Sequence, residues 1–310
     1  MITLAGISAH VPDTVVPIEA VCGPQGLSRS EAKLFRRYYG LDTVRWAATS
    51  DLADILLAAA GKLAALRGRE HQVRYVVAAR TLQKVSADPT AILTRVCREL
   101  GLSTATAFAL TQHACASGLL AVYLAGQLLA DGGDPDALAL VLAGEKAFTP
   151  TAQFIPATTV MGEGTAAVLV GIDGPGERVL SYATHTDGRF RDGLLLAGEL
   201  SAQFHQAYGN ALCDVMSRAA RQAGLDLAEV DLVIPHNVNR VSWVRLCQAI
   251  GYPVERVFLD NVPVLGHCFG ADPFINLASA LERGRVRPGD RYLMVSVGLG
   301  ATFSAMVAGH

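Results

Sequence analysis

Short runs of apolar residues alternate with longer helical stretches along most of this 310-residue chain. The run at residues 137–142, Ala-Leu-Ala-Leu-Val-Leu, contains no polar position that could face water. A strand that is apolar on both faces must be covered on both faces, which is typical of a sheet lying between two layers of helices. The alternation therefore predicts a layered α/β protein.

Periodicity and segment length separate the expected strands from the expected helices. We expect strands at residues 2–11, 73–79, 104–110, 137–142, 164–171, 178–184, 232–235 and 292–297. We expect helices at residues 51–66, 91–100, 117–130, 201–223, 239–250 and 273–283. The second part of the chain thus repeats the alternation of the first.

Two similar glycine-containing segments indicate that the chain consists of two related halves. Gly162 and Gly164 precede one small-residue strand, and Gly298 and Gly300 precede the last strand. Glycine at such a place indicates a close backbone approach or a positive φ angle. Because each pair introduces the terminal strand of its part, we interpret the pattern as a duplication. The predicted halves are residues 1–172 and 173–310.

The balance of charges excludes several classes of function. Lys and Arg number 26 against 28 Asp and Glu, and the chain has no basic block. A nucleic-acid-binding or membrane-surface protein would need such a basic patch. The apolar runs are far shorter than the ~20 residues that span a bilayer, and the first residues do not resemble a secretory signal. We expect a cytoplasmic protein with no nucleic-acid partner and no membrane association.

Six cysteines are spread through the sequence without a Cys-x-x-C pair or a tight cluster with histidine. This spacing argues against a structural zinc site and a disulfide framework, so we expect no metal. For most of these thiols the simplest interpretation is a small buried side chain. That interpretation applies to Cys22, Cys97, Cys213, Cys247 and Cys268.

Cys115 differs from the other cysteines because it lies between a predicted strand and a predicted helix. The positive end of a helix dipole stabilises a thiolate in the first turn. The residues at positions 114 and 116–118 are small, which permits a tight turn and leaves room for a substrate. By itself this arrangement leaves two interpretations open, a nucleophile and a structural thiol.

Residues 114–118, Ala-Cys-Ala-Ser-Gly, resemble the nucleophile motif of the thiolase-fold condensing enzymes, especially of the β-ketoacyl-(acyl-carrier-protein) synthase III family. Residues 235–240 are similar to that family's His-Gln-Ala-Asn-x-Arg motif, and residues 266–271 lie where the family has Gly-Asn-Thr-Ser-Ala-Ala. The two glycine-rich strands match as well. Residues 36–45 loosely resemble a segment near the family's entrance for the phosphopantetheine arm. The resemblance covers nearly the whole chain.

The resemblance implies an α/β, thiolase-like fold with five layers, αβαβα, built from two duplicated halves. The half at residues 1–172 would carry the nucleophile, and the half at residues 173–310 would carry the histidines. The resemblance also implies a homodimer, with an acyl carrier protein or a CoA thioester as acyl donor. No cofactor is expected, since phosphopantetheine or CoA enters as part of the substrate.

The family's functional residues are placed on this sequence by the matching motifs. Cys115 would form the acyl-enzyme, and His236 would deprotonate a nucleophile or polarise a thioester carbonyl. The backbone amides of Cys115 and Gly300 would form the oxyanion hole. The remaining positions implied to bind substrate are Arg36, Arg37, Asn239 and Phe269.

The sequence departs from the family at His267, where the condensing enzymes usually have asparagine. An amide always donates a hydrogen bond, whereas an imidazole donates or accepts according to its protonation. Asp272 follows five residues later and could hold the ring so that it acts as a base, which gives a Cys–His–Asp relay. The same aspartate precedes Pro273 at an expected helix start, so it is equally a candidate for a helix cap.

Natural-product offshoots of the family resemble this sequence in having His and Asp at these positions, and they transfer acyl groups to oxygen or nitrogen nucleophiles. We therefore expect an acyltransferase that takes an acyl group from a carrier-protein or CoA thioester onto Cys115. It would then transfer this group to a hydroxyl, amine or thiol of a small-molecule acceptor. We expect the reaction to belong to polyketide or other natural-product biosynthesis. Two alternatives stay open. One is a decarboxylative Claisen condensation by Cys115, His236 and His267, and the other is a catalytically silent subunit of a heterodimer.

Overall fold

Nine strands form one mixed sheet in the computed structural model, which describes residues 1–21, 27–82, 89–147 and 149–310. Across the described residues the strands lie in the order β11-β12-β13-β10-β1-β9-β6-β4-β5. The strands of residues 1–172 are β1 (Ile2–His10), β4 (Val73–Ala79), β5 (Thr106–Leu110), β6 (Leu138–Ala143) and β9 (Thr165–Ile172). Those of residues 173–310 are β10 (Glu177–Thr186), β11 (Leu232–Ile234), β12 (Arg291–Gly298) and β13 (Thr302–Gly309).

The two halves of this sheet have the same topology. In the first half β6 pairs parallel with β4 and antiparallel with β9, which in turn is antiparallel to β1. In the second half β12 pairs parallel with β11 and antiparallel with β13, which is antiparallel to β10. A single bridge between Val233 and Val257 occupies the place that β5 has beside β4. The halves join where Thr3 and Leu4 of β1 pair with β10.

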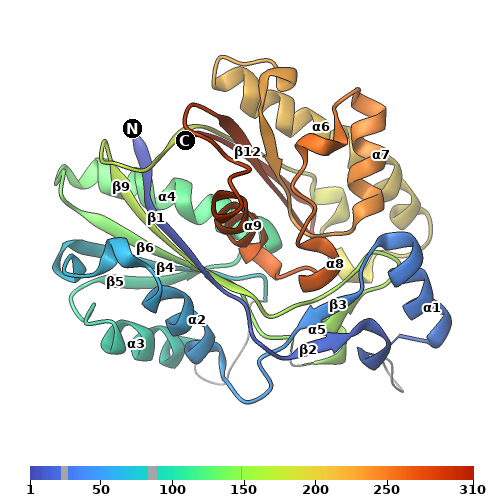
Figure 1. The fold of residues 1–310 in the computed structure, drawn as a ribbon, viewed down its shortest axis with the longest axis horizontal. Helices are drawn as coiled ribbons and strands as arrows, with labels where there is room; N and C mark the ends of the chain where they lie inside the picture. Colours follow the sequence, from blue (N-terminus) through green and yellow to red (C-terminus); the bar gives the residue numbers. More distant parts are fainter. Residues whose placement is uncertain (22–26, 83–88, 148) are drawn as a thin grey trace.

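Helices cover both halves of the sheet and also lie between them (Figure 1). On the outer face of the first half are α2 (Leu52–Gly61) and α3 (Pro89–Glu99), and on that of the second are α6 (Gly198–Gln222) and α7 (Arg240–Ile250). The central helices α4 (Ser117–Gly132) and α9 (Asp272–Glu282) contact strands of both halves. The predicted five-layered, thiolase-like α/β fold is thereby confirmed.

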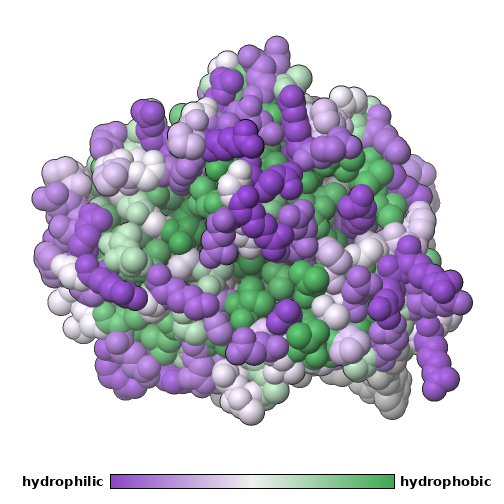
Figure 2. Space-filling view, viewed as in Figure 1, coloured by the Kyte–Doolittle hydropathy of each residue, from purple (hydrophilic) through white to green (hydrophobic). Residues whose placement is uncertain are grey.

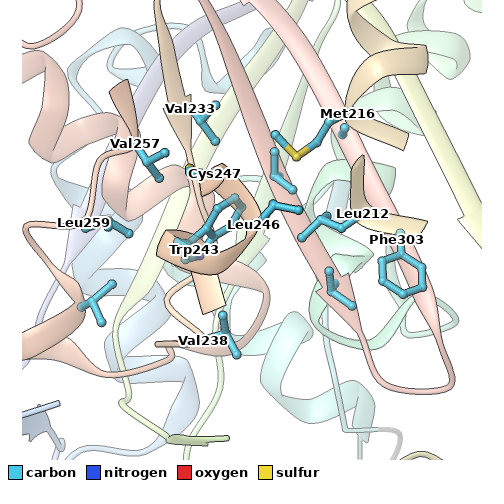
Figure 3. Packing of buried hydrophobic residues seen from close by; sticks show 14 of the residues in the cluster. Leu212, Met216, Val233, Val238, Trp243, Leu246, Cys247, Val257, Leu259 and Phe303 are labelled. Carbon is cyan, nitrogen blue, oxygen red and sulfur yellow. The ribbon is translucent and has the colours of Figure 1, made fainter. Parts of the chain in front are cut away.

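Buried apolar side chains hold these layers together. One group surrounds Trp243 of α7 and includes Leu212 and Met216 of α6 (Figure 3). A second, central group joins Leu119 of α4 and Phe274 of α9 to strands of both halves. Each such side chain stabilises the fold by about 1.5–3 kcal/mol when it is fully buried. The central helices are therefore fixed from both sides, and the loops that lead into them are fixed as well.

The segment Ala114–Gly132, which contains α4, is long and apolar enough to cross a membrane by length and composition alone. In this structure Leu119, Val122 and Ala125 of that segment are fully buried in the central core. A helix that is apolar on all sides is also typical of a protein core. The position of α4 between the two halves of the sheet accounts for its composition.

Shorter elements gather beside the second half of the sheet, at the lower right of Figure 1. They are α1 (Arg29–Leu34), β2 (Val15–Pro17), β3 (Thr43–Arg45), α5 (Pro150–Gln153), β7 (Phe154–Ile155), β8 (Thr159–Val160) and α8 (Val262–Leu265). A bridge between Met161 and His267 connects this region to the loop that follows α8. Figure 2 shows hydrophilic residues over most of the rim of this face and hydrophobic side chains nearer its centre.

The repeated glycines allow a loop of one half to lie against the backbone of the other half. A Cβ atom on Gly298 would lie 1.9 Å from the carbonyl oxygen of His113. A Cβ atom on Gly162 would lie 2.2 Å from the carbonyl oxygen of Leu265. Both distances are far shorter than a van der Waals contact, so only glycine fits at these places. The two halves consequently meet at the loops before Cys115 and His267.

Replacing Gly298 by alanine tests this contact. We expect Gly298→Ala to lower the free energy of unfolding by about 1–3 kcal/mol, because the new methyl group must displace backbone. The control is Gly209→Ala, in the middle of α6, where the Cβ position is open. It should raise the free energy of unfolding by about 0.5–1 kcal/mol. Urea denaturation measures both, and equal stabilities of the two variants would contradict this account.

Candidate active site

Cys115 lies in the turn between β5 and α4, as the sequence predicted. Ala114, just before it, has a φ of +45°, a strained conformation for a residue with a side chain. The carbonyl oxygen of Cys115 accepts a hydrogen bond of 2.8 Å from Ser296 of β12, and its Sγ atom accepts one of 3.4 Å from Thr81. Contacts from both halves of the sheet therefore hold this buried thiol in place.

The first turns of α4 and α9 touch through two glycines. A Cβ atom on Gly118 would lie 2.5 Å from the carbonyl oxygen of Gly270, and a Cβ atom on Gly270 would lie 3.4 Å from that of Cys115. A side chain at Gly118 would separate the two segments, whereas a Cβ atom on Gly270 would make only an ordinary van der Waals contact. Because position 118 is glycine, Cys115 before α4 comes close to the turn that leads into α9, whose first residue is Asp272.

His267 follows α8 and is held by backbone hydrogen bonds on both sides. Its N–H donates to the carbonyl oxygen of Val160 at 2.9 Å, and its carbonyl oxygen accepts from the N–H of Gly162 at 2.9 Å. The ring of Phe269 is stacked against it, with the centroids 6.4 Å apart. Nδ1 of His267 is hydrogen-bonded to the carboxylate of Asp272. Nε2 is therefore the nitrogen left for Cys115 and a substrate.

Asp272 is the first residue of α9, and its side chain is completely buried. Besides contacting His267, the carboxylate accepts hydrogen bonds from the backbone N–H groups of Asn237 at 2.6 Å and of Cys268 at 2.7 Å. None of these donors belongs to α9, whose N-cap residue is Ala271. The interpretation of Asp272 as a helix cap is therefore wrong, because its side chain instead orients His267.

The charges around His267 determine what its ring can do. Burial alone lowers the pKa of His267, but the negative charges of Asp272 and Cys115 outweigh burial and raise it to about 10. At neutral pH the ring is therefore an imidazolium that can give up a proton. Because the charge on Cys115 is one of the two causes, acylation of that thiolate favours release of the proton.

His236 follows β11 and lies beside His267, with the ring centroids 6.0 Å apart and the planes at 71°. Its carbonyl oxygen accepts a hydrogen bond of 3.0 Å from the indole of Trp243, and its Nε2 lies 3.1 Å from the hydroxyl oxygen of Tyr208. Burial, and then the positive charge of His267, lower the pKa of His236 to about 3. At neutral pH one imidazole of the pair is charged and the other is neutral.

A cavity of about 370 Å³ brings the cysteine and both histidines together. This volume is near the lower end of the range for small-molecule sites. The wall combines apolar residues with hydroxyl and imidazole groups from one side of α6. The lining residues include Cys115, Thr159, Ser201, Phe204, His205, Tyr208, His236, Val238, His267 and Leu299.

Arg36 and Arg37, which were predicted to bind substrate, do not line this cavity. Both are exposed on the helical turn Phe35–Tyr39, which follows α1. Arg36 pairs with Glu19 at 3.0 Å and with Asp42 at 3.1 Å. The two arginines line a separate depression at the surface. Their contact with a substrate stays a prediction for the part of a donor that remains outside the cavity.

Three further predicted residues lie close to the site. Asn239 is the N-cap of α7, and its Nδ2 donates to the carbonyl oxygen of Thr158 at 2.9 Å. Phe269 is buried and stacks on His267. Gly300 has a φ of +128° in the loop before β13. The side chains of Asn239 and Phe269 thus contact Thr158 and His267, which line the cavity, and in this way they support its wall.

Thr81 and Tyr208 touch predicted catalytic groups but were not themselves predicted from the sequence. Thr81, which donates to Sγ of Cys115, follows the end of β4. Glu145, which follows β6, is completely buried and accepts from the N–H of Thr81 at 3.0 Å; burial raises the pKa of Glu145 to about 7. The ends of parallel strands meet at one edge, which is the available signal for Thr81. No sequence signal pointed to Tyr208 on α6.

In the described ranges, no group of three or more His, Cys, Asp and Glu side chains could hold a metal ion. Five of the six cysteines lie in those ranges, and all five are free thiols. Cys22 lies outside the described residues. Of the described thiols, Cys115 is the one that lines the cavity with both histidines.

Residues 220–309 match the C-terminal domain of 3-oxoacyl-[acyl-carrier-protein] synthase III. Among curated relatives, the β-ketoacyl-[acyl-carrier-protein] synthase III of Cereibacter sphaeroides is 26% identical to this chain. That alignment covers 97% of this chain and 97% of the relative. The similarity therefore extends over both halves of the fold.

Solved structures with the same fold include ChlB3, an acyltransferase, and the priming β-ketosynthase of the R1128 polyketide biosynthetic pathway. ChlB3 has a TM-score of 0.84 at 22% identity, covering 99% of this chain and 97% of that chain. The ketosynthase has a TM-score of 0.81 at 20% identity, covering 100% of this chain and 96% of that chain. Over nearly its whole length the chain is therefore similar to β-ketoacyl-(acyl-carrier-protein) synthase III enzymes, and it has their thiolase-like fold.

Proposed function

We propose that this enzyme is an acyltransferase that accepts an acyl group on Cys115 from a carrier-protein or CoA thioester. It then transfers the group to a hydroxyl, amine or thiol of a small-molecule acceptor, in polyketide or other natural-product biosynthesis. The observation that carries the proposal is the buried carboxylate of Asp272 on Nδ1 of His267, where the condensing enzymes of the family have asparagine. An amide cannot take up a proton from an acceptor, whereas an imidazole held in this way can.

Acylation of Cys115 uses the proton that His267 carries at neutral pH. The thiolate attacks the thioester carbonyl, a new S–C bond forms, and the bond from the carbonyl carbon to the carrier sulfur breaks. His267, with a pKa of about 10, gives its Nε2 proton to the departing sulfur, so the carrier leaves as a thiol. The ring is then neutral, and the acyl group is on Cys115.

Transfer to the acceptor moves a proton in the opposite direction. Neutral His267 keeps its Nδ1–H on Asp272 and presents the Nε2 lone pair to the acceptor. As the acceptor's O, N or S atom attacks the acyl carbon, its proton moves to Nε2, and the Cys115 sulfur leaves with the bonding electron pair. The thiolate and the imidazolium are restored, so protons balance over the cycle.

The backbone N–H groups of Cys115 and Gly300 form the oxyanion hole in this proposal. Cys115 lies in the short helical turn Ala114–Ala116 that leads into α4, at the end where backbone N–H groups lack partners within the helix. The φ of +128° at Gly300 is a conformation that other residues rarely adopt, and the neighbouring Leu299 lines the cavity. Both observations support a backbone donor on each side of the acyl carbon.

Decarboxylative Claisen condensation with Cys115, His236 and His267 is the second candidate, because His236 is retained in the cavity. That reaction needs hydrogen-bond donors on the oxygen of a malonyl thioester. His267, held on Nδ1 by Asp272, offers one donor at Nε2, but Nε2 of His236 is already in contact with Tyr208. These contacts favour transfer over condensation. The presence of a buried nucleophile and base in one cavity likewise counts against a silent subunit.

The proposal includes a homodimer in the cytoplasm, with no cofactor beyond the pantetheine of the donor thioester. β5 forms one edge of the sheet, and its residues Thr106, Ala107 and Ala109 are exposed. An edge strand with small apolar residues presents unpaired N–H and C=O groups to a second strand. Pairing with β5 of another copy would cover this edge.

Intact-mass spectrometry after incubation with a panel of acyl thioesters tests the function. We expect one acyl group on the wild-type protein and none on Cys115→Ala, because the cysteine is the nucleophile. Cys213→Ala, which removes a thiol outside the cavity, is the control and should keep the adduct. Wild-type protein that takes up no acyl group would contradict the proposal. Carbon dioxide release coupled to a β-keto product would establish condensation instead.

The pH dependence of acylation tests the role of Asp272. His267 is protonated below its pKa of about 10 and loses the proton as the pH rises through that value, so acylation should slow there. The substitution Asp272→Asn removes the larger of the two negative charges that raise the pKa of His267. We expect the basic limb of the pH–rate profile to move to lower pH by about one unit or more. The rate of acyl-Cys115 formation is the quantity to measure.

The matched control for that profile is Asp260→Asn. This exposed carboxylate pairs with Arg283 at 2.8 Å and does not line the cavity. Its loss should leave the basic limb where it is in the wild-type protein, because an exposed charge is screened by solvent. Identical profiles for Asp272→Asn and the wild-type protein would show that this carboxylate does not control the protonation of His267.

A further inference from the structure

Tyr208 lies in the active-site cavity but takes no part in the transfer steps described above. It projects from α6, and its hydroxyl oxygen lies 3.1 Å from Nε2 of His236. Its ring makes edge contacts with Phe204 and Phe303, with the centroids 5.8 Å and 5.7 Å apart. Burial raises the pKa of Tyr208, so the phenol keeps its proton. A neutral hydroxyl is thus fixed on His236.

The contact engages Nε2 of His236 in either tautomer. His236 stays neutral because burial and the charge of His267 lower its pKa to about 3. If Nε2 has the lone pair, Tyr208 donates to it; if Nε2 carries the hydrogen, it donates to the phenol oxygen. In both cases His236 presents no free Nε2–H to the cavity.

A free Nε2–H on His236 is what the decarboxylation of a malonyl thioester would use. In that step the bond between the α-carbon and the carboxylate breaks and carbon dioxide leaves. The electron pair moves into a thioester enolate, whose oxygen must receive hydrogen bonds. The charged ring of His267, held on Nδ1 by Asp272, can supply one such donor from Nε2. His236 is the neutral imidazole in the cavity, and Tyr208 occupies the nitrogen that would serve as the further donor.

We propose that Tyr208 is a specificity-determining residue: by engaging Nε2 of His236 it suppresses decarboxylation, so that a malonyl-type acyl group remains intact on Cys115 for transfer. The inference rests on the proposed function and extends it to a class of acyl donor, thioesters with a free β-carboxylate. Tyr208 does not touch the reacting carbon in this role. Instead, its hydroxyl contacts Nε2 of His236, so that this nitrogen cannot donate a hydrogen bond to the thioester oxygen.

The test compares Tyr208→Phe with the wild-type protein, using malonyl-CoA as the probe. In the variant, the enolate left after loss of carbon dioxide takes a proton from water and gives the acetyl thioester. We expect this release to be at least about tenfold faster than in the wild-type protein, because one added donor to an oxyanion changes a rate by that factor or more. Intact mass should show acylation of Cys115 in both proteins.

Tyr182→Phe is the matched control. It removes another tyrosine hydroxyl, which lies 3.3 Å from Oγ of Ser304 and does not line the cavity. Its decarboxylation rate should equal that of the wild-type protein. A double variant, Tyr208→Phe with His236→Ala, should lose the gained activity, because His236 supplies the new donor. A general loosening of the fold would not depend on His236 in this way.

A Tyr208→Phe protein that is acylated on Cys115 but releases carbon dioxide no faster than the wild-type protein overturns the inference and leaves the proposed function intact. Retention of the gained activity in the double variant also overturns it. Wild-type protein that takes up no acyl group from any thioester counts against the proposed function instead. If the phenylalanine variant is not acylated, Tyr208→Met removes the same hydroxyl and decides the question by the same measurement.

Discussion

The hydrogen bond between Asp272 and His267 is the interaction on which this site depends. A buried carboxylate is costly unless it is paired and hydrogen-bonded, and Asp272 has an imidazole and two backbone N–H groups as partners. The same bond fixes the orientation of the His267 ring and, together with the charge on Cys115, its protonation. In the proposed function, this arrangement allows Nε2 of His267 to act first as an acid and then as a base.

The duplicated fold brings these residues together. Cys115 precedes α4 in the first half and Asp272 begins α9 in the second, and the two helix starts meet through Gly118 and Gly270. The loop contact at Gly298 fixes the approach to the cysteine from the other half. A single half could not form this site, because the proposed nucleophile, Cys115, and the proposed base, His267, belong to different halves.

Local chemistry made part of this structure predictable from the sequence. The strand at residues 73–79 was placed by periodicity at the same bounds as β4, and the strand–turn–helix position of Cys115 followed from its neighbours. The contact of Asp272 with His267 was predicted from the sequence as one of two alternatives, because the spacing suits a helix cap and a histidine partner equally. Tyr208 precedes His236 by 28 residues on a different element, and only tertiary packing brings their side chains into contact.

The protonation of His267 can be observed directly by nitrogen NMR of the histidine rings, with His267→Gln used to assign the signal. The account predicts that at about pH 8 both ring nitrogens of His267 carry hydrogen while His236 stays neutral. Acylation of Cys115 should then leave His267 with hydrogen on Nδ1 alone. A neutral His267 in the free enzyme, together with a His236 that titrates near neutral pH, would contradict the central claim.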